Sequence, residues 1–175
     1  MDKIKVIFLD RDGTIIEETE SGVIDSIADL RFLPKVVESL QKLKFDGYHF
    51  VMVTNQPGLG KGRVNPEGFE EVQKQLIKLF AMDKVFFDEI FVCPHLEEEQ
   101  CNCKKPKIGM VKEYIEKNDI ALDRSFVIGD RSTDVGLAKN LGIKSIRMSA
   151  ANDPDADFTT NSWKEVADFI LDYSF

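Results

Sequence analysis

The chain has 175 residues, 43% of them apolar, which suffices for one domain with a substantial core. Its 31 acidic and 23 basic side chains give a net charge of −8, so sequence-independent binding to nucleic acid has no electrostatic basis. No run approaches the roughly 20 apolar residues of a membrane span, and no signal-peptide core precedes the first predicted strand. We therefore expect a single, monomeric domain over residues 1–175, located in the cytoplasm and acting on small solutes.

The first half of the chain predicts a β-α-β unit followed by a second helix. Apolar, β-branched runs at 4–9 and 48–53 are typical of buried strands. Between them, residues 34–47 begin with proline, carry apolar side chains at helical spacing and end with glycine, which favours a helix. Residues 65–82 open with an Asn-Pro pair, a cap and a first-turn proline, and continue at helical spacing.

The second half repeats this alternation. Its predicted elements are, in order, a strand at 89–92, a helix at 110–118, a strand at 125–128, a helix at 133–141 ending at Gly142, a strand at 144–148, and a last helix that starts with a capping box at 162–165. Residues 150–161 are expected to be irregular.

Strands that alternate with helices, and that are too apolar to have a solvated face, predict the fold class. We expect an α/β protein with three layers, a Rossmann-like parallel sheet covered by helices on both sides. Three predicted loops, at 17–31, 56–64 and 94–108, each follow the carboxyl end of a strand. Ligands bind at that edge of open α/β sheets, so these loops are the expected rim of a site.

Two carboxylates follow the first strand, in the sequence Asp10-Arg11-Asp12-Gly13-Thr14. They can serve as a nucleophile and a proton carrier if a cation suppresses their mutual repulsion. Gly13 permits a sharp turn, after which backbone N–H groups could face a phosphate. Asp-x-Asp-Gly is also a common turn or calcium-loop fragment, so the interpretation depends on the other strand ends.

Those strand ends carry matching chemistry. Thr54 and Asn55 end the second strand and can bond phosphoryl oxygens, although a cap is an equal alternative for Thr54. Asp130 ends the fourth strand and would lie beside Asp10. Such an oxygen-rich pocket suits Mg²⁺, which takes a few carboxylates and keeps several waters.

Two further groups could complete this site. Asp134 would be another anchor, or else a favourable charge in the first turn of a helix. The run Lys104-Lys105-Pro106-Lys107 places cations just before the third helix. One of them can neutralise the charge that spreads over a transferring phosphoryl group, and the alternative is an ordinary basic loop.

All three cysteines of the chain fall in one short window around a histidine. Cys93, Cys101 and Cys103 together with His95 offer three thiolates and one imidazole, the composition of a closed tetrahedral Zn²⁺ site. An odd number of cysteines argues against a disulfide framework. We therefore predict a structural zinc loop at 93–103, with free thiols as the alternative. Because Lys105 follows Cys103 by two residues, the metal would hold this lysine in place.

The segments FLDRDGT, VTNQ, KKPK and VIGDRSTD stand in this order along the chain. The set resembles the four motifs of the haloacid dehalogenase superfamily and covers most of its core domain. The resemblance implies an Mg²⁺-dependent phosphatase with no large cap domain. The implied roles are nucleophile for Asp10, general acid and base for Asp12, phosphate binding for Thr54, a stabilising cation for Lys105, and Mg²⁺ coordination by Asp10, the Asp12 carbonyl and Asp130, supported by Asp134.

The zinc loop is similar to that of one branch, which contains histidinol-phosphate phosphatases and heptose bisphosphate phosphatases. Segments 23–26, 30–34, 57–60 and 93–96 look closer to the histidinol-phosphate enzymes. Segment 61–63, Lys-Gly-Arg, is similar to the heptose enzymes, whose second phosphate needs cationic contacts.

An acidic rim at Glu17, Glu18 and Glu20 would favour a substrate that bears an amine and an imidazole. We therefore expect histidinol phosphate as substrate, in histidine biosynthesis, with D,D-heptose 1,7-bisphosphate as the alternative. The expected substrate-binding residues are Thr54, Asn55, Lys104, Lys105, Glu17 and Glu18.

Two other classes of protein have related features. A phospho-acceptor signalling module also arranges aspartates, a threonine and a lysine around Mg²⁺ on a parallel sheet. Its acidic pair and its acceptor usually lie on different strands, whereas Asp10 and Asp12 share one loop here. A catalytically silent zinc-binding interaction domain is the other alternative, and substitution of Asp10 would leave its function unchanged.

Overall fold

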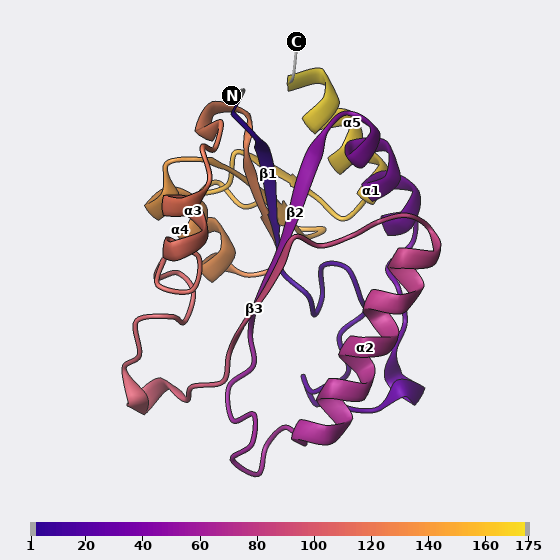
Figure 1. The fold of residues 1–175 in the computed structure, drawn as a ribbon, viewed down its shortest axis with the longest axis vertical. Coiled ribbons are helices and arrows are strands. Elements are labelled where there is room, and N and C mark those ends of the chain that lie inside the picture. The colour runs from indigo at the N-terminus through magenta and orange to yellow at the C-terminus, as the bar shows by residue number, and fades with distance from the viewer. Residues whose placement is uncertain (1–2, 174–175) are drawn as a thin grey trace.

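The computed structural model describes residues 3–173 (Figure 1). A six-stranded sheet runs through the described chain in the order β3-β2-β1-β4-β5-β6, and every pair of neighbouring strands is parallel. The strands are β1 (Lys5–Leu9), β2 (Tyr48–Asn55), β3 (Glu89–Cys93), β4 (Phe126–Gly129), β5 (Lys144–Met148) and β6 (Phe158–Thr160). The sheet class predicted from the apolar runs is confirmed.

The first strand lies at the centre of this arrangement. Leu9, its last residue, is level with Met52 of β2 on one side and with Ile128 of β4 on the other. The chain therefore leaves β1 towards β2 and β3, and later returns to the opposite side of β1 with β4. Such a reversal of strand order opens a crevice at the carboxyl ends of the strands.

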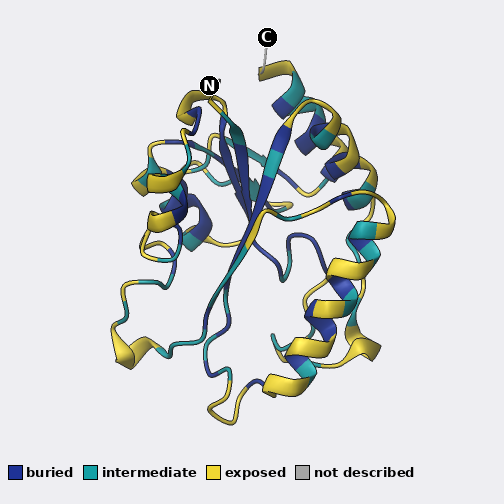
Figure 2. Cartoon of the chain, viewed as in Figure 1, coloured by how far each residue is buried: buried dark blue, intermediate teal, exposed yellow. Residues whose placement is uncertain are grey.

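Helices cover both faces of the sheet, as Figure 1 shows. The helices are α1 (Val36–Phe45), α2 (Pro66–Met82), α3 (Lys112–Lys117), α4 (Ser132–Leu141) and α5 (Trp163–Tyr173), with short 3-10 turns η1 (Ile27–Asp29), η2 (Glu97–Glu99) and η3 (Leu122–Arg124). Buried side chains of α1, α2 and α5 form one core cluster with the sheet, and those of α3 and α4 form a second. The strands are mostly buried, whereas the helices expose their outer faces (Figure 2).

Local signals in the sequence explain where several helices begin and end. The Asn65 side chain accepts a hydrogen bond from the Gly68 amide at 2.9 Å, which caps α2. Gly142 adopts a left-handed conformation (φ 68°) directly after α4. At the start of α5, the Ser162 hydroxyl accepts from the Glu165 amide, but the Glu165 carboxylate accepts from Thr160.

Two local predictions need correction. Residues 150–161 are not wholly irregular, because β6 forms there and adds an edge strand to the sheet. Asp157 ties this segment to β5 by accepting the Ser145 amide at 2.8 Å. The third helix is shorter than predicted: it begins at Lys112, because the Val111 amide donates to the Ile108 carbonyl in a turn that precedes the helix.

Among residues 3–173, no helix combines the length and apolar character needed to cross a bilayer.

Candidate active site

The carboxyl ends of β1, β2 and β4 open into a cleft of about 280 Å³. Its lining comes from four segments that the sequence places far apart: the turn after β1, the end of β2 with its loop, the loop before α3, and the start of α4. The lining residues are Asp10, Asp12, Glu18, Gly22, Thr54, Asn55, Gln56, Pro57, Arg63, Val64, Glu97, Lys104, Lys105, Arg131 and Thr133. Charged side chains therefore dominate a site built on a buried apolar sheet.

Three carboxylates meet at this edge of the sheet. Asp10, Asp130 and Asp134 each offer an oxygen atom, and these oxygens lie within 4.8 Å of one another. Two glycines make the approach possible: a Cβ on Gly13 would lie 2.4 Å from Asp130 Oδ2, and one on Gly129 would lie 2.0 Å from Asp134 Cγ. Asp10 and Asp130 thus lie side by side, as neighbouring strands predict.

The environment of Asp130 fits a bound cation. Its Oδ1 atom is buried and has no hydrogen-bond partner. Burial and then the negative charge of Asp10 raise the pKa of Asp130 to about 8. A divalent ion that accepts oxygen ligands would satisfy the free oxygen and remove the repulsion between the two carboxylates, so the donor set suits Mg²⁺.

A buried lysine balances the other two carboxylates. Lys105 is only 4% exposed, and its Nζ atom donates to Asp10 Oδ1 at 2.8 Å and to Asp134 Oδ1 at 2.7 Å. Burial opposes the charged form, but the two carboxylates outweigh it and raise the pKa of Lys105 above its ordinary value. The second oxygen of Asp134 accepts the Arg131 amide at the start of α4, so both of its expected roles are compatible with its contacts.

Asp12 is held between two side chains that the sequence did not single out. Gln56 donates to Asp12 Oδ2 at 2.7 Å, and the fully buried Arg11 guanidinium lies 3.2 Å from Asp12 Oδ1. Burial raises the pKa of Asp12, while Arg11 and the Gln56 hydrogen bond lower it. Because this carboxylate faces Arg11 and Gln56, a contribution of Asp12 to a cation site would come from its main-chain carbonyl.

The two polar residues at the end of β2 have different surroundings. Thr54 is buried, lines the cleft and accepts a hydrogen bond from Gln56 at 3.0 Å. Asn55 also lines the cleft, but its amide group is bonded to the main chain of Lys105 at both ends, at 3.0 and 3.3 Å. Both ends of the Asn55 amide thus have main-chain partners, and its expected contact with phosphoryl oxygens stays a prediction.

The outer rim differs from the expected acidic surface. Glu18 lines the cleft but forms an ion pair with Arg131, and Lys104 forms one with Glu97. Glu17 and Glu20 are exposed and are not among the described residues that line the cleft. The predicted contact between Glu17 and the substrate therefore lacks support from the geometry.

Arg63, from the Lys-Gly-Arg segment, and Arg131, to which the sequence assigned no role, both line the cleft. Arg131 lies inside the VIGDRSTD segment and Gln56 inside VTNQ. Their closeness in sequence to the motif aspartates and to Thr54 indicates a position at the site. Arg63 stands in the loop 56–64, which is expected at the rim, and its presence in the lining agrees with that expectation. Among the described residues, Arg63 forms no ion pair that would neutralise it.

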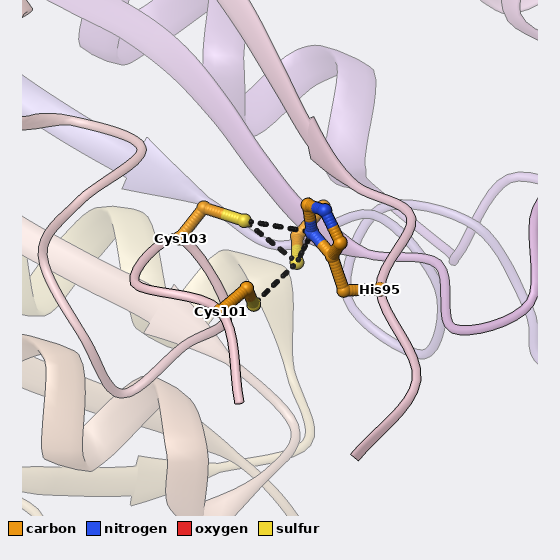
Figure 3. A group of neighbouring side chains, drawn as sticks. His95, Cys101 and Cys103 are labelled. Atoms are coloured by element: carbon orange, nitrogen blue, oxygen red, sulfur yellow. Dashed lines mark hydrogen bonds between the residues drawn. The ribbon is translucent and has the colours of Figure 1, made fainter. Parts of the chain in front are cut away.

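A second cluster lies beside the cleft and contains the predicted zinc ligands (Figure 3). His95 Nδ1 lies 3.1 Å from Cys103 Sγ, and Cys93 Sγ lies 3.1 Å from Cys103 Sγ and 3.6 Å from Cys101 Sγ. With metal–sulfur bonds of about 2.3 Å, ligand atoms around one ion lie roughly 3 to 4 Å apart. The four side chains are compatible with a tetrahedral zinc site.

Comparisons with known proteins identify the family of this chain. The family described as Polynucleotide kinase 3 phosphatase matches residues 5–165. The chain belongs to this family. It is therefore a phosphatase of the haloacid dehalogenase type, and the resemblance found in the four sequence motifs is confirmed.

Two curated relatives and one solved structure illustrate the relationship. "Histidine biosynthesis bifunctional protein HisB" of Campylobacter jejuni subsp. doylei is 42% identical over 95% of this chain and 45% of the relative. The protein of the same name from Actinobacillus pleuropneumoniae serotype 3 is 45% identical over 81% of this chain and 39% of the relative. The chain thus spans less than half the length of these relatives.

The solved structure is D,D-heptose 1,7-bisphosphate phosphatase from B. bronchiseptica, complexed with magnesium and phosphate. It shares the fold, with a TM-score of 0.84, 24% identity, and coverage of 97% of this chain and 99% of that one. Like that fold, the described residues contain no large cap.

We expect Mg²⁺ to stabilise the protein more at pH 8 than at pH 6. Without metal, the raised pKa of Asp130 lets the folded state keep a proton that the unfolded chain releases near pH 4, so stability falls as the pH rises towards about 8. A cation competes with that proton, and its stabilising effect grows over the same interval. Thermal unfolding with and without MgCl₂ measures this difference.

The matched control is Asp130→Asn, which should lose the Mg²⁺-dependent rise in Tm at both pH values. An equal rise at pH 6 and pH 8 in the unsubstituted protein would contradict the role of this carboxylate.

Proposed function

We propose that the protein hydrolyses a small phosphate monoester through a phosphorylated intermediate on Asp10. The observation that carries this proposal is the surroundings of the Asp10 carboxylate. Asp10 directly follows the central strand β1, and its carboxylate receives a 2.8 Å hydrogen bond from a buried lysine and lies beside Asp130, with Thr54 at the neighbouring strand end. A cation and an ammonium group on the two sides of one carboxylate suit an anionic substrate.

In the first half-reaction, a carboxylate oxygen of Asp10 attacks phosphorus, and the bond from phosphorus to the ester oxygen breaks. Asp12 transfers its proton to that leaving oxygen. Lys105 and the Thr54 hydroxyl hold the phosphoryl oxygens, on which charge accumulates. Mg²⁺, held by Asp10, Asp130 and the Asp12 carbonyl, would lower the repulsion between the anionic nucleophile and the anionic ester.

In the second half-reaction, the deprotonated Asp12 takes a proton from water, and the water oxygen attacks the phosphoryl group on Asp10. Phosphate leaves, and the Asp10 carboxylate and protonated Asp12 are restored. Gln56 and Arg11 hold the Asp12 carboxylate at both oxygens, which supports its use in both steps from one position. Hydrolysis is therefore the outcome that these contacts favour.

The proposed substrate is histidinol phosphate. Support comes from the 42% identity to a histidine biosynthesis protein over nearly the whole chain. The size of the cleft, about 280 Å³, suits a small metabolite. Its rim also holds two carboxylates, Glu18 and Glu97, that an amine or imidazole could approach, although each now faces a cation of the protein itself.

A second candidate, D,D-heptose 1,7-bisphosphate, is favoured by Arg63. This guanidinium lines the cleft and is not offset by an ion pair within residues 3–173, so it could bind a second phosphate. Lys61, the other cation of the same loop, is paired with Glu99 and does not line the cleft. The shared fold with a heptose bisphosphate phosphatase is compatible with this candidate.

Substrate choice is tested with Arg63→Gln. If the second phosphate binds at Arg63, kcat/KM for heptose bisphosphate should fall about 10-fold or more, because a charge-assisted contact of roughly 1.5 to 3 kcal/mol is lost. Turnover of histidinol phosphate, which carries positive charge at its far end, should stay the same or rise. Lys61→Gln is the control, and it should change neither rate.

The nucleophile is tested with Asp10→Asn, which keeps the shape of the side chain and removes its nucleophilic oxygen. Phosphate release should fall by at least about 1,000-fold while Tm stays close to its original value. A phosphorylated wild-type protein that persists for minutes without releasing phosphate would instead favour the signalling module. Unchanged phosphate release by the variant would contradict the mechanism.

The Cys93, His95, Cys101 and Cys103 cluster is proposed to bind one structural Zn²⁺. His95→Ala should reduce the zinc found by elemental analysis from about one per chain to well below one, and should lower phosphate release without removing a reacting group. His49→Ala is the matched control, because His49 pairs with Asp88 away from the cluster. Full zinc content in the His95 variant would exclude this assignment.

A further inference from the structure

We infer that Asn55 is a positioning residue that sets the main-chain register of Lys105. The inference rests on the proposed function, because it assumes that the Lys105 ammonium acts on the phosphoryl group. It assigns to Asn55 a task other than substrate binding. The Asn55 side chain acts as a clasp between the end of β2 and the loop that carries the lysine.

The geometry of the clasp involves both ends of one amide group. Asn55 Oδ1 accepts the Lys105 main-chain N–H at 3.0 Å, and Asn55 Nδ2 donates to the Lys105 main-chain carbonyl at 3.3 Å. The two residues are 50 positions apart. A side-chain amide that bonds the donor and the acceptor of a single residue fixes the position and the orientation of that residue together.

Lys105 needs such support because no helix or strand carries it. It belongs to the irregular segment between η2 and α3, and its ammonium group must nevertheless reach Asp10 and Asp134 in a fully buried position. The entropy of an unsupported loop would oppose this placement. Bonds to the main chain restrict the loop without occupying the ammonium group.

Asn55 also adjoins the cysteine cluster. In the sheet, Asn55 is level with Cys93 of β3, and Cys103 precedes Lys105 by two residues. The cysteine cluster is therefore adjacent to both partners of the clasp, through Cys93 beside Asn55 and through Cys103 near Lys105. Successive side chains of a strand leave on opposite faces, so β2 can present Thr54 to one partner and Asn55 to another.

The chain contains a matched control for this contact. Asn140 of α4 donates a hydrogen bond from its side chain to the Pro106 carbonyl at 2.9 Å, one residue beyond Lys105. It holds the same segment, and within residues 3–173 it has no hydrogen bond to Lys105 itself. Loss of Asn140 therefore reports on general loosening of the loop, whereas loss of Asn55 reports on the register of the lysine.

The experiment compares Asn55→Ala, Asn55→Asp and Asn140→Ala. For Asn55→Ala, kcat for the best substrate should fall about 10- to 100-fold with little change in KM, because a small displacement of a group that acts in the transition state costs this much. Asn55→Asp keeps the acceptor for the Lys105 N–H and should recover part of the loss. Asn140→Ala should stay within about threefold of the wild type.

Two further measurements separate positioning from a merely structural effect. Binding of orthovanadate, which resembles the transferring phosphoryl group, should weaken in Asn55→Ala and not in Asn140→Ala. In the Lys105→Ala background, adding Asn55→Ala should cause no further loss of turnover, because both changes remove the same contribution. Measurements of Tm and of zinc content identify any variant whose overall fold or metal site is disrupted.

The outcomes separate the inference from the proposed function. A wild-type protein that releases no phosphate from any ester would overturn the proposed function. An active wild type whose Asn55→Ala variant keeps kcat and vanadate affinity within about threefold would overturn the role of Asn55 alone. Equal losses in Asn55→Ala and Asn140→Ala, or additive losses with Lys105→Ala, would also overturn it.

Discussion

The candidate active site depends on the balance between negative and positive charge at the carboxyl ends of three parallel strands. Asp10, Asp130 and Asp134 crowd into one small volume, and a single buried ammonium group, that of Lys105, faces two of them. Asp130 keeps a buried oxygen without a hydrogen-bond partner, and its pKa is raised as a result of burial and repulsion. The folded chain therefore maintains a deficit of positive charge, which a divalent cation can correct.

The fold supports this crowding through its backbone. Gly13 and Gly129 lack the side chains that would collide with Asp130 and Asp134, so two strand ends can approach closely. The hydrophobic cores on both sides of the sheet stabilise the strands and thereby hold charged groups that repel one another. The two hydrophobic cores thus stabilise the fold away from the cleft. This stability allows the cleft to keep three carboxylates close together despite their repulsion.

At the rim of the cleft, most charged side chains are paired with a side chain of opposite charge. Two of its cations, Lys104 and Arg131, are offset by Glu97 and Glu18, so the rim is nearly neutral where those pairs form. Arg63 adds a positive charge that is not offset in this way within the described chain. The groups proposed to react stand at the ends of strands, whereas the rim of the cleft is made of loop residues such as Arg63, Glu97 and Lys104.

Much of this protein follows from its sequence alone. The alternation of apolar runs with helical periodicity determined the sheet and helix layers, and the positions of Asp10, Asp130 and Lys105 at element boundaries indicated that they would meet. The spacing of Cys93, His95, Cys101 and Cys103 indicated a common metal site. Tertiary structure alone decided that Asn55 turns to the Lys105 backbone, that Arg63 and not Lys61 of their shared loop lines the cleft, and that Glu17 does not. The physical reason is that strand and helix periodicity is local, whereas loop side chains take their partners from segments whose approach depends on the packing of the whole chain.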